Sequence, residues 1–231
     1  MMKIQAFLKS HTFLKDSAIF IADSHYSKKN QDLKKLLLKI KNEEIKTTQI
    51  FLVGDIFHLL LPFRFLIEYN KEIIDLINEI SKTKEVYYFE GNHDFCLEGV
   101  FDKNVKVLKE LKKDRICINH GDIYIKDKFY RFYTKIIRNK VIMNFLHIIS
   151  LNFINNWVFK KILNKKIKCD FMKEFEKLAK DKILFYQKCA LIIEGHYHQN
   201  KIYKNYINLP SLYCQKSFLH LQNGTFLELF I

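Results

Sequence analysis

The sequence is poor in glycine and proline, and it has no closely spaced pair of cysteines. Of the 231 residues, 6 are Gly and 2 are Pro, and no internal repeat or low-complexity linker is visible. The length therefore predicts a single domain over 1–231, with room for an insertion. The five cysteines are scattered and form no C-x-x-C motif. We expect reduced thiols of a cytoplasmic protein, rather than disulfides or structural zinc. The first residues lack a sustained apolar segment, so no signal peptide is predicted.

Acidic residues are also in short supply, with 25 Asp and Glu against 39 Lys and Arg and a formal net charge of +14. Such an excess usually indicates nucleic acid, an anionic membrane surface or a phosphorylated substrate as a partner. Lys, Asn, Ile and Phe are all abundant, and an AT-rich genome would produce the same bias. The position of the charges along the chain is therefore more informative than their sum.

Short apolar runs alternate with helical patterns along the chain. Five of these runs are typical of strands buried on both faces, and they cover residues 18–22, 49–53, 86–89, 115–119 and 190–193. Apolar residues at helix spacing predict helices over 31–41 and 65–81. The Asn223-Gly224 pair between two further apolar runs predicts a terminal hairpin. Together, these patterns predict an α/β layered fold with a mixed sheet.

Each of the five runs is followed by Asp, His or Asn, which predicts one site at one edge of a sheet. The candidates are Asp23, His25, Asp55, Asn92, His93, His120, His196 and His198. His93 is not counted as a ligand. The other seven residues offer two carboxylates, an amide oxygen and four imidazoles, which suit Mn, Fe, Co or Zn better than Ca or Mg. Seven ligands fit two such ions if one carboxylate bridges them. Taken singly, each motif is equally typical of an ordinary polar turn.

In order and spacing, the five blocks resemble the calcineurin-like metallophosphoesterase superfamily. The blocks are Asp23-x-His25, Gly54-Asp55, Gly91-Asn92-His93-Asp94, His120-Gly121-Asp122 and Gly195-His196-x-His198. The resemblance implies a four-layer α/β/β/α sandwich with mixed sheets and two divalent ions, manganese before Fe, Co or Zn. The first ion would bind Asp23, His25, Asp55 and His198, and the second would bind Asp55, Asn92, His120 and His196.

The resemblance also implies how such a site would hydrolyse a phosphoester. Two ions would share a water, lower its pKa and direct it in line at phosphorus. His93 would stabilise the transition state or protonate the leaving oxygen, and Asp94 is counted with it as a catalytic candidate. Asp94 and Asp122 would also orient imidazoles. The other histidines, His11, His58, His147 and His220, are predicted to be structural or exposed.

A basic and apolar insertion over about 126–168 follows the His120 block. It holds eleven Lys or Arg and one acid, Asp127, and its middle, 141–159, has no charged residue. Several Asn and Ser residues make this middle a poor transmembrane helix. A basic, apolar helical segment is typical of a membrane-surface element or a lid over an amphiphilic ligand. An ordinary helical hairpin packed on the core would show the same pattern.

More narrowly, the chain resembles the UDP-2,3-diacylglucosamine diphosphatases of lipid A biosynthesis, which carry a helical lid at this point. The loosely matching lid candidates are Asp127, Tyr130, Arg131, Tyr133 and Arg138. The resemblance implies cleavage of an acylated nucleotide sugar to UMP and 2,3-diacylglucosamine 1-phosphate, at the cytoplasmic face of an anionic inner membrane. The chain departs from the best-known branch at His93, where that branch has Arg, and at His58, where an acid is usual.

Two other functions fit parts of the pattern. A nuclease or cyclic-nucleotide phosphodiesterase could use the basic insertion on nucleic acid, but the apolar middle of the insertion disfavours this reading. A non-catalytic scaffold with the same fold would be expected to lose ligands, and this chain retains all seven. The sequence does not predict the oligomeric state.

Overall fold

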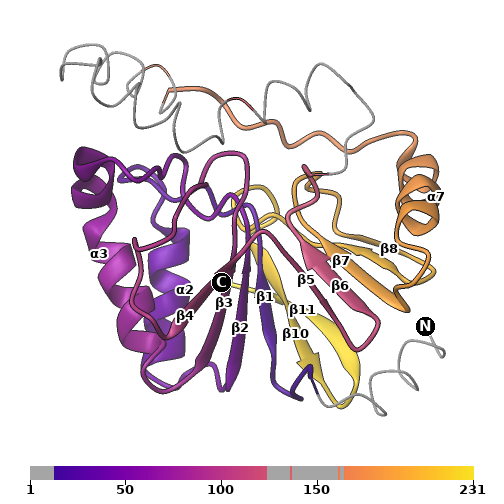
Figure 1. Cartoon of the computed structure of the whole chain (residues 1–231), viewed down its shortest axis with the longest axis horizontal. Coiled ribbons are helices and arrows are strands. Elements are labelled where there is room, and N and C mark those ends of the chain that lie inside the picture. Colours follow the sequence, from indigo (N-terminus) through magenta and orange to yellow (C-terminus); the bar gives the residue numbers. More distant parts are fainter. Residues whose placement is uncertain (1–12, 124–135, 137–160, 162–163) are drawn as a thin grey trace.

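The computed structural model describes residues 13–123, 136, 161 and 164–231, and it contains two β-sheets packed face to face (Figure 1). The larger sheet has the order β11-β10-β1-β2-β3-β4, and the smaller has the order β5-β6-β7-β9-β8. The larger sheet consists of β1 (Ile19–Ile21), β2 (Gln49–Val53), β3 (Glu85–Phe89), β4 (Val105–Leu108), β10 (Ser217–Gln222) and β11 (Thr225–Phe230). The smaller sheet consists of β5 (Glu110–Lys113), β6 (Ile116–Asn119), β7 (Leu191–Glu194), β8 (Lys201–Tyr203) and β9 (Tyr206–Asn208).

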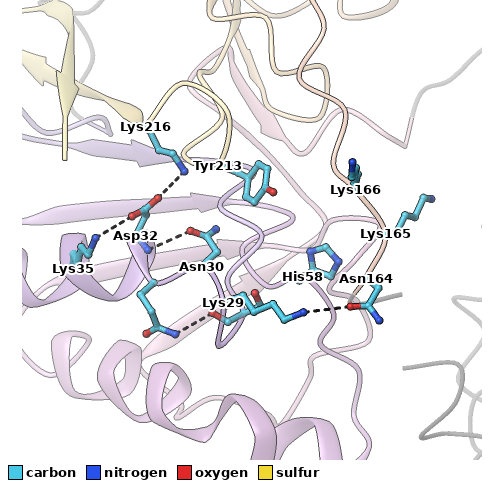
Figure 2. Close-up of a pocket in the computed structure, with 12 residues that line it drawn as sticks. Lys29, Asn30, Asp32, Lys35, His58, Asn164, Lys165, Lys166, Tyr213 and Lys216 are labelled. Atoms are coloured by element: carbon cyan, nitrogen blue, oxygen red, sulfur yellow. Dashed lines mark hydrogen bonds and ion pairs between the residues drawn. The ribbon is translucent and has the colours of Figure 1, made fainter. Parts of the chain in front are cut away.

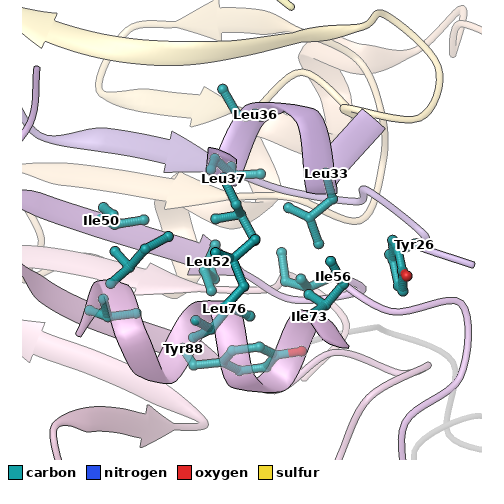
Figure 3. Packing of buried hydrophobic residues seen from close by; sticks show 14 of the residues in the cluster. Tyr26, Leu33, Leu36, Leu37, Ile50, Leu52, Ile56, Ile73, Leu76 and Tyr88 are labelled. Carbon is teal, nitrogen blue, oxygen red and sulfur yellow. The ribbon is translucent and has the colours of Figure 1, made fainter. Parts of the chain in front are cut away.

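In the described part of the chain, the helices α2 (Asp32–Lys41), α3 (Arg64–Ile80) and α7 (Phe175–Phe185) cover the outer faces of the two sheets. The helices α2 and α3 lie on the larger sheet, and α7 lies on the smaller one (Figure 1). Buried Leu33, Leu36 and Leu37 recur at helix spacing along α2 and form its inward face. They pack with residues of α3, β2 and β3 (Figure 3). The result is a four-layer α/β/β/α sandwich, as expected.

The alternation of side chains along each strand separates the core into layers. In β2, Ile50 and Leu52 face the helices, whereas Phe51 and Val53 face the second sheet. Phe51 is fully buried, and its ring stacks on Phe20 at 4.7 Å between centroids. Because β1 to β4 run parallel and are covered on both faces, their central members are continuous apolar runs.

The predicted elements agree with the structure to within one or two residues. The Asn223-Gly224 pair forms the turn between β10 and β11, with both residues at positive φ. The strands β4, β5 and β8 were not predicted, because they are short and carry lysines or exposed positions. The buried strand β9 was not predicted because it has only three residues. Most of the predicted lid, including Asp127, Tyr130, Arg131, Tyr133 and Arg138, lies outside the described residues, as do His11 and His147.

The expectation of reduced thiols is wrong for four of the five cysteines. Disulfides join Cys117 to Cys189 and Cys169 to Cys214. The first pair meets because β6 and β7 are neighbours. The second pair meets because the chain after the insertion lies against the loop before β10, where the Cys214 Sγ atom is 3.9 Å from the Lys168 carbonyl oxygen. The spacing of the cysteines along the sequence does not reveal that the members of either pair lie close together. In the described part of the chain, no helix has the length and apolar character needed to cross a bilayer.

Candidate active site

The predicted ligands meet at one end of both sheets. Asp23, Asp55 and Asn92 follow β1, β2 and β3 of the larger sheet, whereas His120 and His196 follow β6 and β7 of the smaller sheet. The expectation of one edge of one sheet is therefore corrected to the shared edge of two packed sheets. Parallel strands present their carboxyl ends together at this edge, so residues far apart in the sequence converge.

Three overlapping groups of side chains have ligand atoms close enough to hold a cation. Within each group these atoms lie within 4.8 Å of one another. The groups are Asp23, His25 and His198; His25, Asp55 and His93; and Asp55, His120 and His196. His25 and Asp55 each belong to two groups, so neighbouring cation positions would share them. Asn92 joins the third group, since its Oδ1 lies 3.3 Å from His120 Nε2.

Several of the candidate ligands have a strained backbone. Five of the candidates have positive φ, a conformation uncommon for residues other than glycine: Asp23, His25, Asp55, His196 and His198. Each such residue costs on the order of 1–3 kcal/mol, which the surrounding structure must offset. Gly54 also has positive φ, and a Cβ there would lie 2.4 Å from His120 Nδ1. The chain is therefore bent sharply and packed closely where the side chains converge.

The buried carboxyl group of Asp94 joins the two loops that carry Asp55 and Asn92. It accepts a hydrogen bond from the Tyr88 hydroxyl at 2.6 Å. It also accepts hydrogen bonds from four backbone N–H groups at 2.6–3.2 Å, those of Asp55, Ile56, Phe57 and Gly91. Burial and the nearby Asp55 raise the pKa of Asp94 to about 7. Asp94 was expected to orient an imidazole, but its hydrogen bonds go to the backbone and Tyr88.

Backbone carbonyl groups orient three of the histidines. The Nδ1 atoms of His93, His120 and His198 lie 2.8–3.0 Å from the carbonyl oxygens of His58, Val53 and Lys168. A carbonyl oxygen only accepts, so each Nδ1 donates and each Nε2 is left for the site. His58 was expected to be structural or exposed. It is buried, and its backbone carbonyl group orients the ring of His93.

Burial and charge set the protonation of the cluster. Burial alone would raise the pKa of Asp55, but His120 and His93 hold that pKa well below its ordinary value. Burial lowers the pKa of His25 to about 3, and burial together with His120 lowers the pKa of His196 to about 4. His25 and His196 are thus neutral imidazoles near an ionised carboxylate at neutral pH.

The donor chemistry of the site fits divalent cations. Both ring nitrogens of His25 are buried without a hydrogen-bond partner in the described part of the chain. Burying a polar group without a partner is costly, and a bound cation would remove that cost. Burial alone would lower the pKa of His120, but Asp55 raises it well above its ordinary value. A positive charge beside Asp55 is therefore favoured, whether a proton or a metal supplies it.

A buried polar network behind the second half of the site was not found from the sequence. Lys182 donates to the Gly121 carbonyl oxygen at 2.8 Å and lies 2.9 Å from the Glu194 carboxylate. Tyr186 donates to the same carboxylate. The network thus ties the turn after His120 to the strand that leads to His196. Asp122 is buried nearby. The sequence signal that could have revealed this network is Lys182, a lysine on the inward face of α7.

A two-sheet α/β/β/α sandwich with Asp, Asn and His gathered at the strand ends is the architecture of a metal-dependent phosphoesterase. The model of the family described as Calcineurin-like phosphoesterase matches residues 17–200, and the chain belongs to this family. The match includes all five blocks of candidate ligands.

The chain is also similar to curated proteins named UDP-2,3-diacylglucosamine hydrolase. The one from Wigglesworthia glossinidia brevipalpis is 26% identical over 203 residues, which cover 81% of each chain. The one from Coxiella burnetii is 23% identical over 208 residues, covering 82% of this chain and 84% of that protein. The one from Shewanella frigidimarina is 24% identical over 208 residues, covering 80% and 83%.

The substitution Asp94→Asn tests the link between the two ligand loops. An amide nitrogen would replace one acceptor and face backbone N–H groups, so we expect a loss of about 3 kcal/mol or more in the free energy of unfolding. Urea denaturation measures this change. The exposed Asp102→Asn serves as the control, with an expected change within about 0.5 kcal/mol. Equal effects of the two substitutions would contradict the role given to Asp94.

Proposed function

We propose that this phosphoesterase uses two divalent ions to cleave the pyrophosphate bond of UDP-2,3-diacylglucosamine, giving UMP and 2,3-diacylglucosamine 1-phosphate. The observation that carries the proposal is the convergence of seven candidate ligands at the shared sheet edge, in a chain similar over four fifths of its length to hydrolases named for this substrate. Manganese is the proposed metal, because a mixed oxygen and nitrogen ligand set suits first-row ions.

In this proposal, Asp55 is shared between the two metal positions. Asp23, His25, Asp55 and His198 hold one ion, and Asp55, Asn92, His120 and His196 hold the other. The contacts within the site support this division. The His198 Nε2 atom lies 3.1 Å from Asp23 Oδ1, and the His120 Nε2 atom lies 3.4 Å from Asp55 Oδ2. When bound, the ions supply a water of lowered pKa and neutralise charge on the phosphoryl oxygens.

His93 is the proposed catalytic acid. Its Nδ1 donates to the His58 carbonyl oxygen, and its backbone N–H donates to Asp55 Oδ1 at 2.8 Å. These two bonds fix the ring beside His25, at 5.0 Å between ring centroids. A positioned imidazole can protonate the oxygen that leaves phosphorus near neutral pH.

An anionic membrane surface is the proposed second partner. Residues 164–174 run across the end of the sheets above the site (Figure 1). This segment carries the exposed Lys165, Lys166 and Lys168, and the ring of Phe171 is 61% exposed. Lysines near an anionic surface contribute about 1 kcal/mol each, and an apolar ring can enter the interface. The protein would reach an acylated substrate in the membrane from such a position.

Hydrolysis of the proposed substrate is the direct test of function. We expect the Mn-supplemented protein to release UMP from UDP-2,3-diacylglucosamine, as measured by chromatography. Asp55→Asn should lower the rate by more than about a hundredfold, since both metal positions lose a ligand. The control is Asp75→Asn, because Asp75 is an exposed acid that pairs with Lys71 on the surface of α3. Turnover of bis(4-nitrophenyl) phosphate without UMP release from the lipid substrate would reject the proposed substrate. It would still support hydrolysis of phosphoesters as the reaction.

The membrane proposal predicts that Phe171→Ser weakens binding to vesicles that contain anionic phospholipid. The expected loss is several-fold in co-sedimentation, because one apolar ring leaves the interface. Phe230 on β11 is similarly exposed, at 67%, so Phe230→Ser is the matched control and should bind like the wild type. Binding that is indifferent to Phe171→Ser, or absent in the wild type, would reject the membrane partner.

A further inference from the structure

A second cavity of about 800 Å³ lies beside the candidate active site. Five lysines line it, and Asp32 is the only acid among the described lining residues. We call it the lysine pocket: Lys29, Lys35, Lys165, Lys166 and Lys216. The other lining side chains are amides, a serine, His58 and Tyr213. Among the described residues, no aliphatic side chain lines it. The volume lies within the range of cavities that hold small ligands.

The lysine pocket lies next to the site and shares part of its wall. Lys165 and Lys166 line both this cavity and the one that contains His25, Asp55 and His93. The rings of His58 and Tyr213 lie 5.8 and 6.0 Å from the His25 ring. Figure 2 shows these two rings between Lys216 and Asp32 on one side and Lys165 and Lys166 on the other. A group attached to a phosphate at the site would therefore lie close to the lysine pocket.

The polar groups of the pocket determine what it would accept. Asp32 is bound by Lys216 at 2.7 Å and by Lys35 at 3.4 Å. Burial alone would raise the pKa of Asp32, but these lysines hold it below its ordinary value. An ionised carboxylate retains lone pairs that accept from hydroxyl groups. Lysine ammonium and amide N–H groups donate to carbonyl oxygens. This combination matches the hydroxyls of a ribose and the carbonyls of a pyrimidine.

The same pocket is a poor place for acyl chains. Methylene groups gain from leaving water only when they meet apolar surface, and desolvating lysine ammonium groups against them would be costly. Apolar side chains occur instead on the other side of the shared lysines, where Ile167 and Met172 line the active-site cavity and Phe171 is exposed. The two ends of an acylated nucleotide sugar thus have chemically different surfaces on which to lie.

We infer that the lysine pocket is the subsite for the nucleoside half of the substrate, with Asp32 accepting from ribose hydroxyls and lysines donating to the base. The inference rests on the proposed cleavage of a nucleotide-linked substrate. It places the nucleoside beyond Tyr213 and His58, and the acylated sugar phosphate toward Ile167 and Met172.

Calorimetric titration of the Mn-loaded full chain with UMP and with glucose 1-phosphate tests the inference. Both probes carry a phosphate for the site, and only UMP carries a nucleoside. We expect Lys216→Gln and Asp32→Asn each to weaken UMP binding by about tenfold or more, because each removes a charged hydrogen-bonding partner. Glucose 1-phosphate should bind both variants as it binds the wild type.

Lys39→Gln is the matched control, because Lys39 lies on α2 outside the pocket, and it should leave UMP binding unchanged. UMP binding that is indifferent to both pocket variants, or an equal loss for glucose 1-phosphate, would overturn the inference. Failure of the wild type to cleave UDP-2,3-diacylglucosamine, with the UMP result as expected, would reject the substrate and support the pocket. Cleavage with UMP binding unaffected by the variants would reject the pocket alone.

Discussion

The arrangement of the site depends on the buried carboxyl group of Asp94. Four backbone N–H groups and the Tyr88 hydroxyl donate to it, so one side chain holds together the turns after β2 and β3. Those turns carry Asp55, Asn92 and His93. Because parallel strands end at a common edge, a single acceptor placed between two turns can fix both of them. The positions of Asp55, Asn92 and His93 follow from this bond network.

The cost of bringing the ligands together is visible in the backbone. Asp23, Asp55 and His196 have positive φ, and among the described residues the buried ring nitrogens of His25 have no hydrogen-bond partner. Packing between the sheets, where Phe20 and Phe51 stack, offsets this strain. Functional sites commonly retain such strain when their surroundings determine the geometry. Cations at the site would bind the lone pairs of these buried side chains and stabilise the folded chain further.

Much of the fold and the ligand set could be predicted from the sequence, because parallel strands buried on both faces leave a simple pattern. The runs that became β1, β2 and β3 are almost entirely apolar, and each is followed by a polar cluster. Strand β8 was missed because it is short and half exposed. The lysine pocket could not be predicted, because lysine occurs throughout the chain and only folding brings Lys29, Lys165 and Lys216 together. The disulfides were missed for the same reason.

The proposed sharing of Asp55 by two cations is tested most directly by the number of metal ions bound per chain. After saturation with Mn and removal of free metal, mass spectrometry of the wild type should give about two ions per chain. His198→Ala should lower the content to about one, because His198 serves a single position in the proposed set, whereas Asp55→Asn should lose most of both. One ion per chain in the wild type, or two ions retained by Asp55→Asn, would contradict the account.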